Sequence, residues 1–155
     1  MKTYRYHIEE LNKNLVFSME KDILISLSLD EATTLPVEQD PVGDFVFQQV
    51  EAYFCGERQV FEIKYDLSSL TAFQQSVLQA LTSIRYGQVT TYKDLAKLAN
   101  HPRAYRAVGS VMAMNPIPLI IPCHRVVRSD GYIGAYSMGG PDFKSWLLEL
   151  EKRHA

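Results

Sequence analysis

Apolar and polar side chains alternate near the start of the chain and predict two short β-strands. The stretch LVFSMEKDILISLSLD places apolar residues at every second position over 15–19 and 23–29, with a polar break at residues 20–22. This pattern is typical of an antiparallel hairpin with one buried face. We therefore expect these two strands to pair as a hairpin.

The next segments predict one helix and one further strand. Residues 32–43, ATTLPVEQDPVG, are acidic and carry two prolines, which indicates a surface connection. The stretch DFVFQQVEAYFCGE has apolar residues near helical spacing and reaches Gly56, a favourable stop. Residues 59–66, QVFEIKYD, then predict a strand, so this part of the chain is expected to be an α+β scaffold.

A helical pattern takes over after residue 70. SSLTAFQQSVLQALTSIRYG offers Ser or Thr as an N-cap and Gly87 as a stop. Its single apolar stripe consists of Phe73, Val77, Leu78 and Leu81. We expect an amphipathic helix packed on the core.

Two shorter helices are predicted on either side of a tight break. Thr91 and Asp94 are a plausible capping pair for a helix over residues 92–99, which residues 100–102 interrupt. The apolar face of the next helix, which ends at Asn115, is formed by Ala104, Ala107, Val108 and Val111. Helix, short break and helix match a DNA-binding helix-turn-helix, although an ordinary helical hairpin has the same pattern.

Composition limits the class of protein. A chain of 155 residues suits one compact domain or two small lobes. No apolar run reaches membrane-spanning length and the N-terminus lacks the apolar stretch of a signal peptide, so we expect a cytoplasmic protein without membrane contact. Cys55 and Cys123 are too few for a disulfide framework and lack metal-ligand spacing, so we expect free thiols and no bound metal.

The charge distribution differs between the two halves. Residues 1–70 carry six Lys or Arg and thirteen Asp or Glu, a balance of −7, whereas residues 71–155 carry ten and five, a balance of +5. The basic half suits an anionic partner such as nucleic acid. A chance distribution over a mixed surface explains the same numbers equally well.

The segment PIPLIIPCHRVV, residues 116–127, holds the most reactive candidate side chain. It predicts a buried strand, in which Cys123 and His124 would point to opposite faces, unless a turn at Pro122 brings both to one pocket. A thiol near an imidazole can be deprotonated, and the thiolate is the nucleophilic form. A cysteine at the end of a strand is, however, most often a small hydrophobic residue.

A longer set of motifs resembles a known family. RAVGSVMAMNPIPLIIPCHRVV, followed by GYIGAYS and WLLELE and preceded by YGQVTTY and TYKDLA, is similar to the O6-alkylguanine-DNA alkyltransferases, also called methylated-DNA–protein-cysteine methyltransferases. The resemblance covers roughly residues 71–151, and YFCGERQVF adds a weaker match in the first half.

The resemblance implies a fold and an activity. It implies an α+β fold with a scaffold domain over 1–70 and a mostly helical domain over 71–155, which carries the helix-turn-helix and the Pro-Cys-His-Arg segment. The implied activity is that of a methylated-DNA–protein-cysteine S-methyltransferase. Such a protein flips O6-alkylguanine, mainly O6-methylguanine, out of double-stranded DNA and transfers the alkyl group irreversibly to its own cysteine. Each molecule would act once, as a monomer and without a cofactor.

Five residues would then carry the chemistry. Cys123 is the implied alkyl acceptor, and His124 the base that acts through a water molecule, with Glu151 holding and polarising the imidazole. Asn115 would brace the turn between the recognition helix and the active-site segment, besides capping the helix. Tyr92 would donate a proton or a hydrogen bond to N3 of the departing guanine.

The resemblance also implies contacts to the base and to DNA. Tyr136 and Ser137 would stand at O6, the backbone carbonyls of Val126 and of the reactive cysteine would accept from the exocyclic amine, and Met112 and Pro118 would line the pocket. Arg106 would fill the gap that the flipped base leaves in the stack. The other implied DNA contacts are the small residues Ala104, Ala107, Gly109 and Ser110, which allow close approach in the minor groove, and Arg103 and Lys93 at phosphates.

Three other classes of protein fit parts of the pattern. An alkyltransferase-like protein binds the lesion without repair, but such relatives replace the cysteine. A cysteine hydrolase would need an oxyanion hole and acyl chemistry. A regulator that uses the helix-turn-helix alone would bind specific undamaged sequences.

Overall fold

The computed structural model describes residues 1–31 and 39–155, and its chain forms two compact units, Met1–Asp66 and Leu67–Ala155. Each unit combines strands with helices, so the predicted α+β class is confirmed. Most of the predicted connection at 32–43 lies outside the described residues. Over the described part of the chain, none of the helices has both the length and the apolar character of a membrane span.

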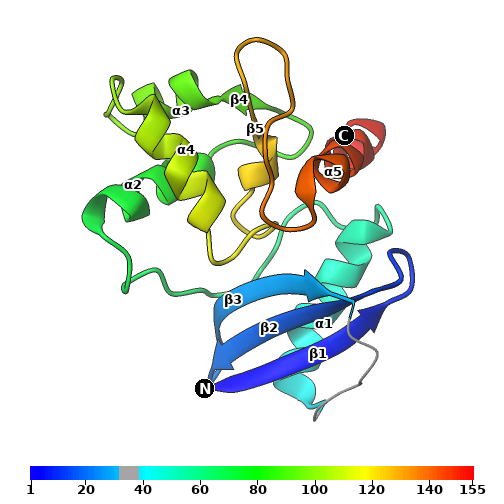
Figure 1. Ribbon diagram of the computed structural model, residues 1–155. Coiled ribbons are helices and arrows are strands. Elements are labelled where there is room, and N and C mark those ends of the chain that lie inside the picture. Colours follow the sequence, from blue (N-terminus) through cyan, green and yellow to red (C-terminus); the bar gives the residue numbers. More distant parts are fainter. Residues whose placement is uncertain (32–38) are drawn as a thin grey trace. The chain divides into compact units, whose positions relative to one another are not determined.

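Unit 1 is built on a three-stranded antiparallel sheet in the order β1-β2-β3 (Figure 1). Its strands are β1 (Lys2–Ile8), β2 (Lys13–Glu20) and β3 (Ile23–Asp30). A two-residue turn with Lys21 at φ +56° joins the second and third strands, which confirms the predicted hairpin. The first strand is an addition to the predicted elements.

Alternation along each strand produces one buried face. Tyr4 and Tyr6 of β1 stack on Phe17 of β2, with ring centroids 5.2 and 5.7 Å away. The phenol groups of these tyrosines donate hydrogen bonds to Asp40 at 2.9 Å and to Asp44 at 2.7 Å. Buried tyrosines need such partners, and these two carboxylates come from the start of the following helix.

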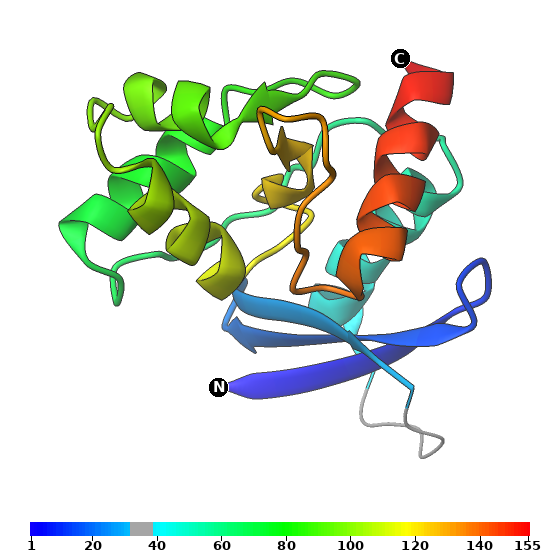
Figure 2. The same cartoon turned by 45° about the horizontal axis from the view of Figure 1, so that its top comes forward.

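Helix α1 (Pro41–Phe54) packs on this face of the sheet and confirms the predicted helix (Figure 2). Asp40 caps its N-terminus by accepting from the Gly43 N–H at 2.9 Å. A Cβ at Gly43 would lie 2.5 Å from a ring carbon of Tyr4, so only glycine fits between the helix and the first strand. The cap and the close approach fix the helix on the sheet.

The strand predicted over residues 59–66 is absent from the structure. This segment meets β3 at a single bridge between Leu24 and Tyr65. The backbone at Glu62 is bonded by the Gln49 side chain instead, through bonds of 2.8 and 3.3 Å to the amide of that glutamine. Because a side chain satisfies these backbone groups, no strand ladder forms.

Unit 2 begins with helix α2 (Ala72–Leu81), which Thr71 and Gln74 open as a capping box. The helix ends earlier than predicted, because Thr82 and Ser83 turn their hydroxyls back to the carbonyls of Gln79 and Ala80 at 2.6 and 2.7 Å. Gly87, the predicted stop, instead lies in the following turn at φ +81°.

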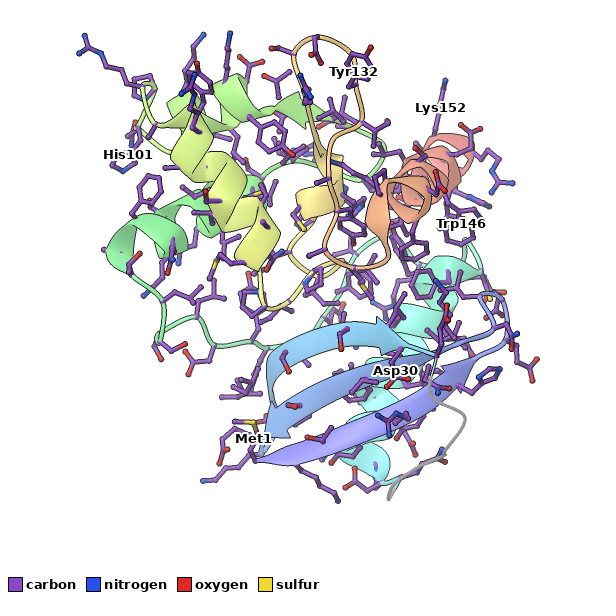
Figure 3. All side chains as sticks on the ribbon, in the orientation of Figure 1. Met1, Asp30, His101, Tyr132, Trp146 and Lys152 are labelled. Atoms are coloured by element: carbon purple, nitrogen blue, oxygen red, sulfur yellow. The ribbon has the colours of Figure 1, made fainter. Side chains whose placement is uncertain are left out.

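Helices α3 (Tyr92–Leu98) and α4 (Tyr105–Met114) form the predicted pair. The Thr91 hydroxyl caps α3 by accepting from the Asp94 N–H at 3.1 Å. Asn100, at φ +64°, opens the short break that carries His101 (Figure 3). Two helices packed across a break of this length have the form of a helix-turn-helix.

The remaining elements of unit 2 are two short strands, a 3-10 turn and a long C-terminal helix (Figures 1 and 2). A short parallel pair joins β4 (Thr90–Thr91) to β5 (Val126–Val127), and helix α5 (Gly140–His154) packs against the 3-10 turn η1 (Cys123–Arg125).

The buried strand predicted over 116–127 is wrong for most of its length, whereas the alternative of a turn at Pro122 is confirmed, because the 3-10 turn η1 begins directly after that proline. The chain folds into a tight turn with Leu119 at φ +75° and a bridge between Pro118 and Ile121, and then enters η1. Three prolines in the segment remove ladder donors, which favours turns over a central strand.

Candidate active site

A cavity of about 170 Å³ in unit 2 reaches the sulfur-bearing residue Cys123. Its walls come from α3, α4, η1 and the loop before α5, and consist of Tyr92, Gly109, Met112, Ala113, Cys123, Ala135, Tyr136 and Ser137. Drug-sized ligands occupy cavities of roughly 300–1,000 Å³, so this one suits a smaller group, such as a single base.

The 3-10 turn places the thiol at the cavity and makes it almost inaccessible to solvent. Cys123 is 3% exposed, and its N–H donates to the Ile121 carbonyl at 2.8 Å. Burial raises the pKa of the Cys123 thiol, while the Asn115 side chain and the charge of Lys144 act in the opposite direction. The thiol is consequently protonated at rest and needs a base to become a nucleophile.

Asn115 joins the end of α4 to the turn that leads to the thiol. Its side-chain amide donates to the Ile121 carbonyl at 3.0 Å, and its side-chain oxygen accepts from the Ile117 N–H at 3.0 Å. The same residue is the C-cap of α4. One buried side chain therefore ties the helix to both ends of the 117–121 turn.

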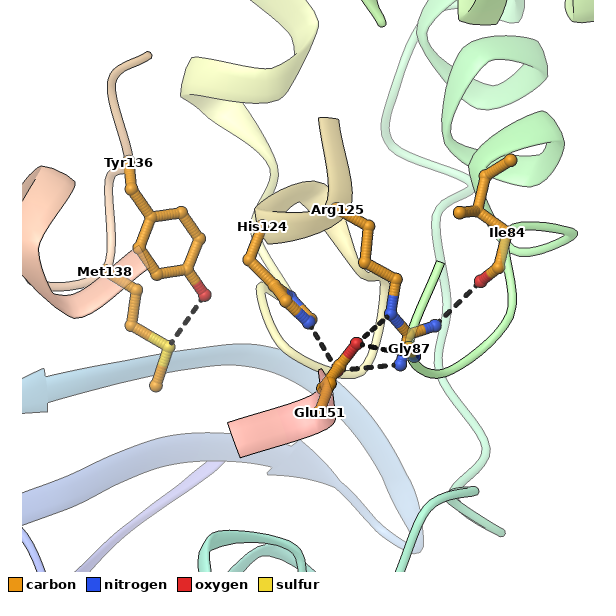
Figure 4. A network of polar contacts seen from close by, with 7 residues as sticks. All are labelled: Ile84, Gly87, His124, Arg125, Tyr136, Met138 and Glu151. Atoms are coloured by element: carbon orange, nitrogen blue, oxygen red, sulfur yellow. Dashed lines mark hydrogen bonds and ion pairs between the residues drawn. The ribbon is translucent and has the colours of Figure 1, made fainter. Parts of the chain in front are cut away.

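Glu151 of α5 is the centre of a buried polar network behind the thiol (Figure 4). His124 Nε2 lies 2.7 Å from Glu151 Oε2, and Arg125 donates to both carboxylate oxygens at 2.8 and 2.9 Å. The Gly87 N–H adds a bond of 3.2 Å, and Arg125 also donates to the Ile84 carbonyl at 2.7 Å. The predicted pairing of histidine and glutamate is thus present as a contact, and the arginine completes it.

The network determines the protonation of the imidazole. Burial would raise the pKa of Glu151, but hydrogen bonds from His124 and Arg125 outweigh it and lower the pKa to about 2. Burial also lowers the pKa of His124, against the opposing effect of Glu151, so the ring is neutral near pH 7. An ionised carboxylate only accepts, so Nε2 carries the proton and Nδ1 carries the lone pair that a base needs.

The structure brings most of the expected substrate residues to the cavity, though not all. Tyr136 is buried, and its ring lies edge-on to that of His124 with the ring centroids 6.4 Å apart. Its hydroxyl donates to the Met138 sulfur at 3.8 Å. Burial raises the pKa of Tyr136 well above the usual value, and burial also raises that of Tyr92. Both phenols therefore stay protonated at neutral pH and can donate.

Of the other expected pocket residues, Met112 and Ser137 line the cavity. Val126 and Pro118 are buried close by in sequence but are not among its lining residues.

Most of the expected DNA-contacting residues lie on α4 or in the break before it, and Lys93 is exposed on α3. Arg106, the adjacent Ala107 and, one helical turn later, Ser110 are exposed, whereas Val108 and Val111 are buried. Ala107 was predicted on the apolar face of this helix, and its exposure shows that this prediction is wrong. Arg103 is exposed in the break, Ala104 is the N-cap of α4, and Gly109 reaches the cavity wall. The exposed stripe and the cavity therefore adjoin along one helix.

Within the described residues, no group of three or more His, Cys, Asp or Glu side chains is arranged to hold a metal ion.

The sequence matches a family model described as the DNA-binding domain of 6-O-methylguanine DNA methyltransferase over residues 72–153, more than half of the chain. The chain belongs to this family. Relatives named methylated-DNA–protein-cysteine methyltransferase include one from Methanosarcina barkeri, 48% identical over 107 residues, which are 69% of this chain and 66% of the relative. One from Methanosarcina mazei is 40% identical over 134 residues, which are 84% of each chain.

Solved structures of the family extend the similarity across most of the chain. The Mycobacterium tuberculosis O6-methylguanine methyltransferase has a TM-score of 0.84 at 35% identity, over 98% of this chain and 93% of that one. The OGT protein of the same organism, in complex with DNA, has a TM-score of 0.81 at 38% identity, over 92% and 88%.

One residue at the site was missed by the sequence analysis. Lys144 is completely buried on the inner face of α5, in line with Leu147 and Glu151. The signal was present, because a lysine three positions before a core leucine and seven before a buried glutamate lies on the apolar side of the helix.

Proposed function

We propose that this chain removes alkyl groups, mainly methyl, from O6 of guanine in double-stranded DNA and keeps them on Cys123. The observation that carries the proposal is the buried thiol at the base of a small cavity beside the exposed stripe of α4. A base inside a duplex is out of reach of a buried thiol, so the target nucleotide is rotated out of the stack into the cavity.

The transfer is a displacement at saturated carbon. The thiol proton passes to His124, through a water molecule, and the sulfur attacks the alkyl carbon. The S–C bond forms as the C–O6 bond breaks, the electron pair of the broken bond goes to the guanine, and the guanine leaves with one proton. The thioether does not hydrolyse, so each molecule reacts once.

The network behind the thiol supports this assignment. Glu151 holds the imidazole with its proton on Nε2, which leaves Nδ1 as the base. Asn115 keeps the turn before Cys123 in place through its two backbone bonds. The neutral phenol of Tyr92 lines the same cavity and suits a donor to N3 of the departing guanine.

The partner is double-stranded DNA, and helix α4 inserts into its minor groove. Arg106 fills the gap in the stack, while the small residues Ala107 and Ser110 allow close approach and Arg103 contacts a phosphate. Relatives of known structure include one in complex with DNA.

The two halves of the chain form domains with different functions. Residues 71–155 are the DNA-binding and alkyl-acceptor domain, and the acidic residues 1–70 are a scaffold domain. Both thiols are free, which fits a reducing compartment such as the cytoplasm.

A methyl-labelled duplex tests the proposal. The protein is mixed with increasing amounts of DNA that carries label in the methyl group of O6-methylguanine. Protein-bound label should saturate at about one equivalent, and the Cys123→Ser variant should bind the duplex without taking label. Binding without transfer by the unaltered chain would make it a lesion-recognition protein, and preference for a specific undamaged sequence would make it a regulator.

A further inference from the structure

The loop after β5 carries an arginine that the proposed reaction has not yet used. Arg128 directly follows β5, and its guanidinium lies 5.5 Å from the centroid of the Tyr132 ring and donates to Asp130 at 2.7 Å. The Arg128 N–H donates to the Tyr132 carbonyl at 3.0 Å, so the chain turns back on itself between these residues. Figure 3 shows Tyr132 on this loop. The turn therefore holds the arginine at the start of the loop.

Backbone pairing places Arg128 beside a residue of the cavity wall. The parallel register pairs Thr91 with Val127. The next residues, Tyr92 and Arg128, therefore leave the two strands side by side. A Cβ built on Gly134 would be 3.2 Å from the Tyr92 hydroxyl and 3.8 Å from Arg128 Cγ, so both side chains lie against the same glycine. Because Tyr92 lines the cavity of the reactive thiol, Arg128 lies close to the edge of that cavity.

The guanidinium is open to solvent although its charge is paired. The side chain of Arg128 is 57% exposed and that of Asp130 is 45% exposed. An ion pair at such a surface contributes little to stability, because water screens both charges. The other oxygen of Asp130 accepts from the Tyr132 N–H at 3.2 Å, so the turn keeps the carboxylate in place. Arg128 can therefore leave this partner with little loss of stability, whereas Asp130 stays with the loop.

A flipped nucleotide brings phosphate groups to the edge of the cavity. Its base enters the cavity, while its sugar and the two flanking phosphates stay outside, since they continue the DNA strand. An arginine at this edge can donate two parallel N–H bonds to the oxygens of one phosphate. Arginine binds carboxylates in the same geometry, so Asp130 occupies a position that also suits a phosphate.

We propose that Arg128 binds a phosphate beside the flipped nucleotide, and that the Asp130 carboxylate takes the place of this phosphate in the free protein. The inference rests on the proposed function. When DNA binds, the guanidinium exchanges one anion for the other. Because the contact with Asp130 is given up in this exchange, the carboxylate lowers the affinity of the protein for DNA.

The charges near Tyr92 agree with an anion at this position. Burial raises the pKa of Tyr92, and the charge of Arg128 acts in the opposite direction, as expected for side chains that lie close together. Lys93, the next residue on α3, is a second exposed cation, and its Nζ lies 5.5 Å from the centroid of the Tyr105 ring. Two cations are thus available near the tyrosine that lines the cavity.

The first test replaces single phosphates of the DNA. In duplexes with one O6-methylguanine, each phosphate near the lesion is replaced in turn by an uncharged methylphosphonate. The affinity of the Cys123→Ser protein is measured alone and combined with Arg128→Gln or Arg153→Gln. One replacement beside the lesion should weaken binding about tenfold, and this loss should disappear with Arg128→Gln. It should persist with Arg153→Gln, the matched control, which removes an exposed arginine from the last turn of α5. The same losses in all three proteins would overturn the proposal.

The second test uses salt and the competing carboxylate. Arg128→Gln should reduce the slope of log K against log salt concentration by about 0.9, the value for one phosphate contact. Asp130→Asn removes the charge and keeps an oxygen for the Tyr132 N–H, so it should tighten binding roughly twofold to fivefold. This gain should vanish when Arg128→Gln is also present. An equal gain with and without Arg128→Gln, or no gain at all, would contradict the exchange of anions.

Methyl transfer from a labelled duplex is measured separately in the unaltered protein. Intact transfer without these phosphate effects would overturn the role of Arg128 and Asp130 alone. The phosphate effects without any transfer would overturn the proposed function alone, because they report DNA binding and not chemistry.

Discussion

Glu151 accepts a hydrogen bond from His124 at 2.7 Å while Arg125 occupies both of its oxygens, so one carboxylate of the C-terminal helix sets the protonation of the imidazole beside the thiol. All three side chains are at least nine-tenths buried. Removing one member of such a network leaves an uncompensated charge in the interior, which costs about 3–5 kcal/mol. The same bonds that prepare the base therefore also hold unit 2 together.

Acid should unfold unit 2 through this carboxylate. The pKa of Glu151 is lowered from 4.5 to about 2, so its contribution to the free energy of unfolding is complete above about pH 4.5 and is lost as the pH falls toward 2. Glu151→Gln should be less stable at pH 7 and should lose less stability over this window. Urea unfolding between pH 2 and pH 7 provides the measurement, because the difference between the two proteins removes the contribution of Asp40, whose pKa is also about 2.

The control is Glu149→Gln, an exposed position two residues earlier on the same helix. It should follow the unaltered protein at every pH. Parallel curves for the unaltered protein and Glu151→Gln would show that the carboxylate does not support the fold.

Gly134 and Gly131 offer a matched pair in the loop before α5. Both have positive φ, +87° and +92°, but a Cβ at Gly134 would press on Tyr92 and Lys144, whereas nothing lies within 4 Å of one at Gly131. Both alanine variants should lose about 1 kcal/mol or more to backbone strain. Only Gly134→Ala should also slow transfer from free O6-benzylguanine, since it alone disturbs the cavity wall, and equal transfer rates in the two variants would contradict this.

Arg106→Ala should separate base flipping from chemistry. The side chain is exposed on α4 and outside the cavity lining, so transfer from free O6-benzylguanine should keep its rate. Repair of duplex DNA should slow about tenfold or more, because unstacking a base costs a few kcal/mol that the inserted arginine offsets. The single-turnover rates of the variant and the unaltered protein are compared on both substrates. Equal slowing on both would contradict a role in base flipping and would mean that Arg106 shapes the pocket.

Cys55 should be a poor nucleophile despite its exposure. Its thiol donates to Glu10 at 3.0 Å, and that bond, followed by burial, raises the pKa of Cys55 to about 11. Glu10→Gln should increase the rate of reaction with a disulfide reagent at least about tenfold, as the thiolate fraction rises. Glu57→Gln, which removes a weaker influence, should change the rate much less, and an unchanged rate in Glu10→Gln would rule out the shielding.

The sequence predicted the elements whose patterns are local. The 23–29 strand, the α1 helix and the capped helix after Thr91 follow from alternation, spacing and caps over a few residues. The first strand was missed because tyrosine carries a polar hydroxyl and does not stand out in a pattern of apolar positions. Tyr4 and Tyr6 can be buried because their hydroxyls donate to Asp40 and Asp44, which lie far away in sequence at the start of α1.

The course of the active-site segment also depended on distant contacts. The 116–127 strand fails because Asn115 bonds two backbone groups of the following turn, which no periodicity reports. The contact between His124 and Glu151 was anticipated from the family resemblance, whereas the partners of Arg125 emerge only from the packing of α5 on η1. Local pattern thus predicts elements, and the polar network behind the thiol requires the tertiary structure.

The central claim is that one cysteine takes the alkyl group once. The most direct measurement is intact-protein and peptide mass spectrometry after reaction with a duplex that contains excess O6-methylguanine. The account predicts a gain of one methyl group per molecule, located on the peptide that carries Cys123, with no further loss of substrate after one equivalent. Methyl on Cys55, or continued consumption of O6-methylguanine by the same molecules, would contradict it.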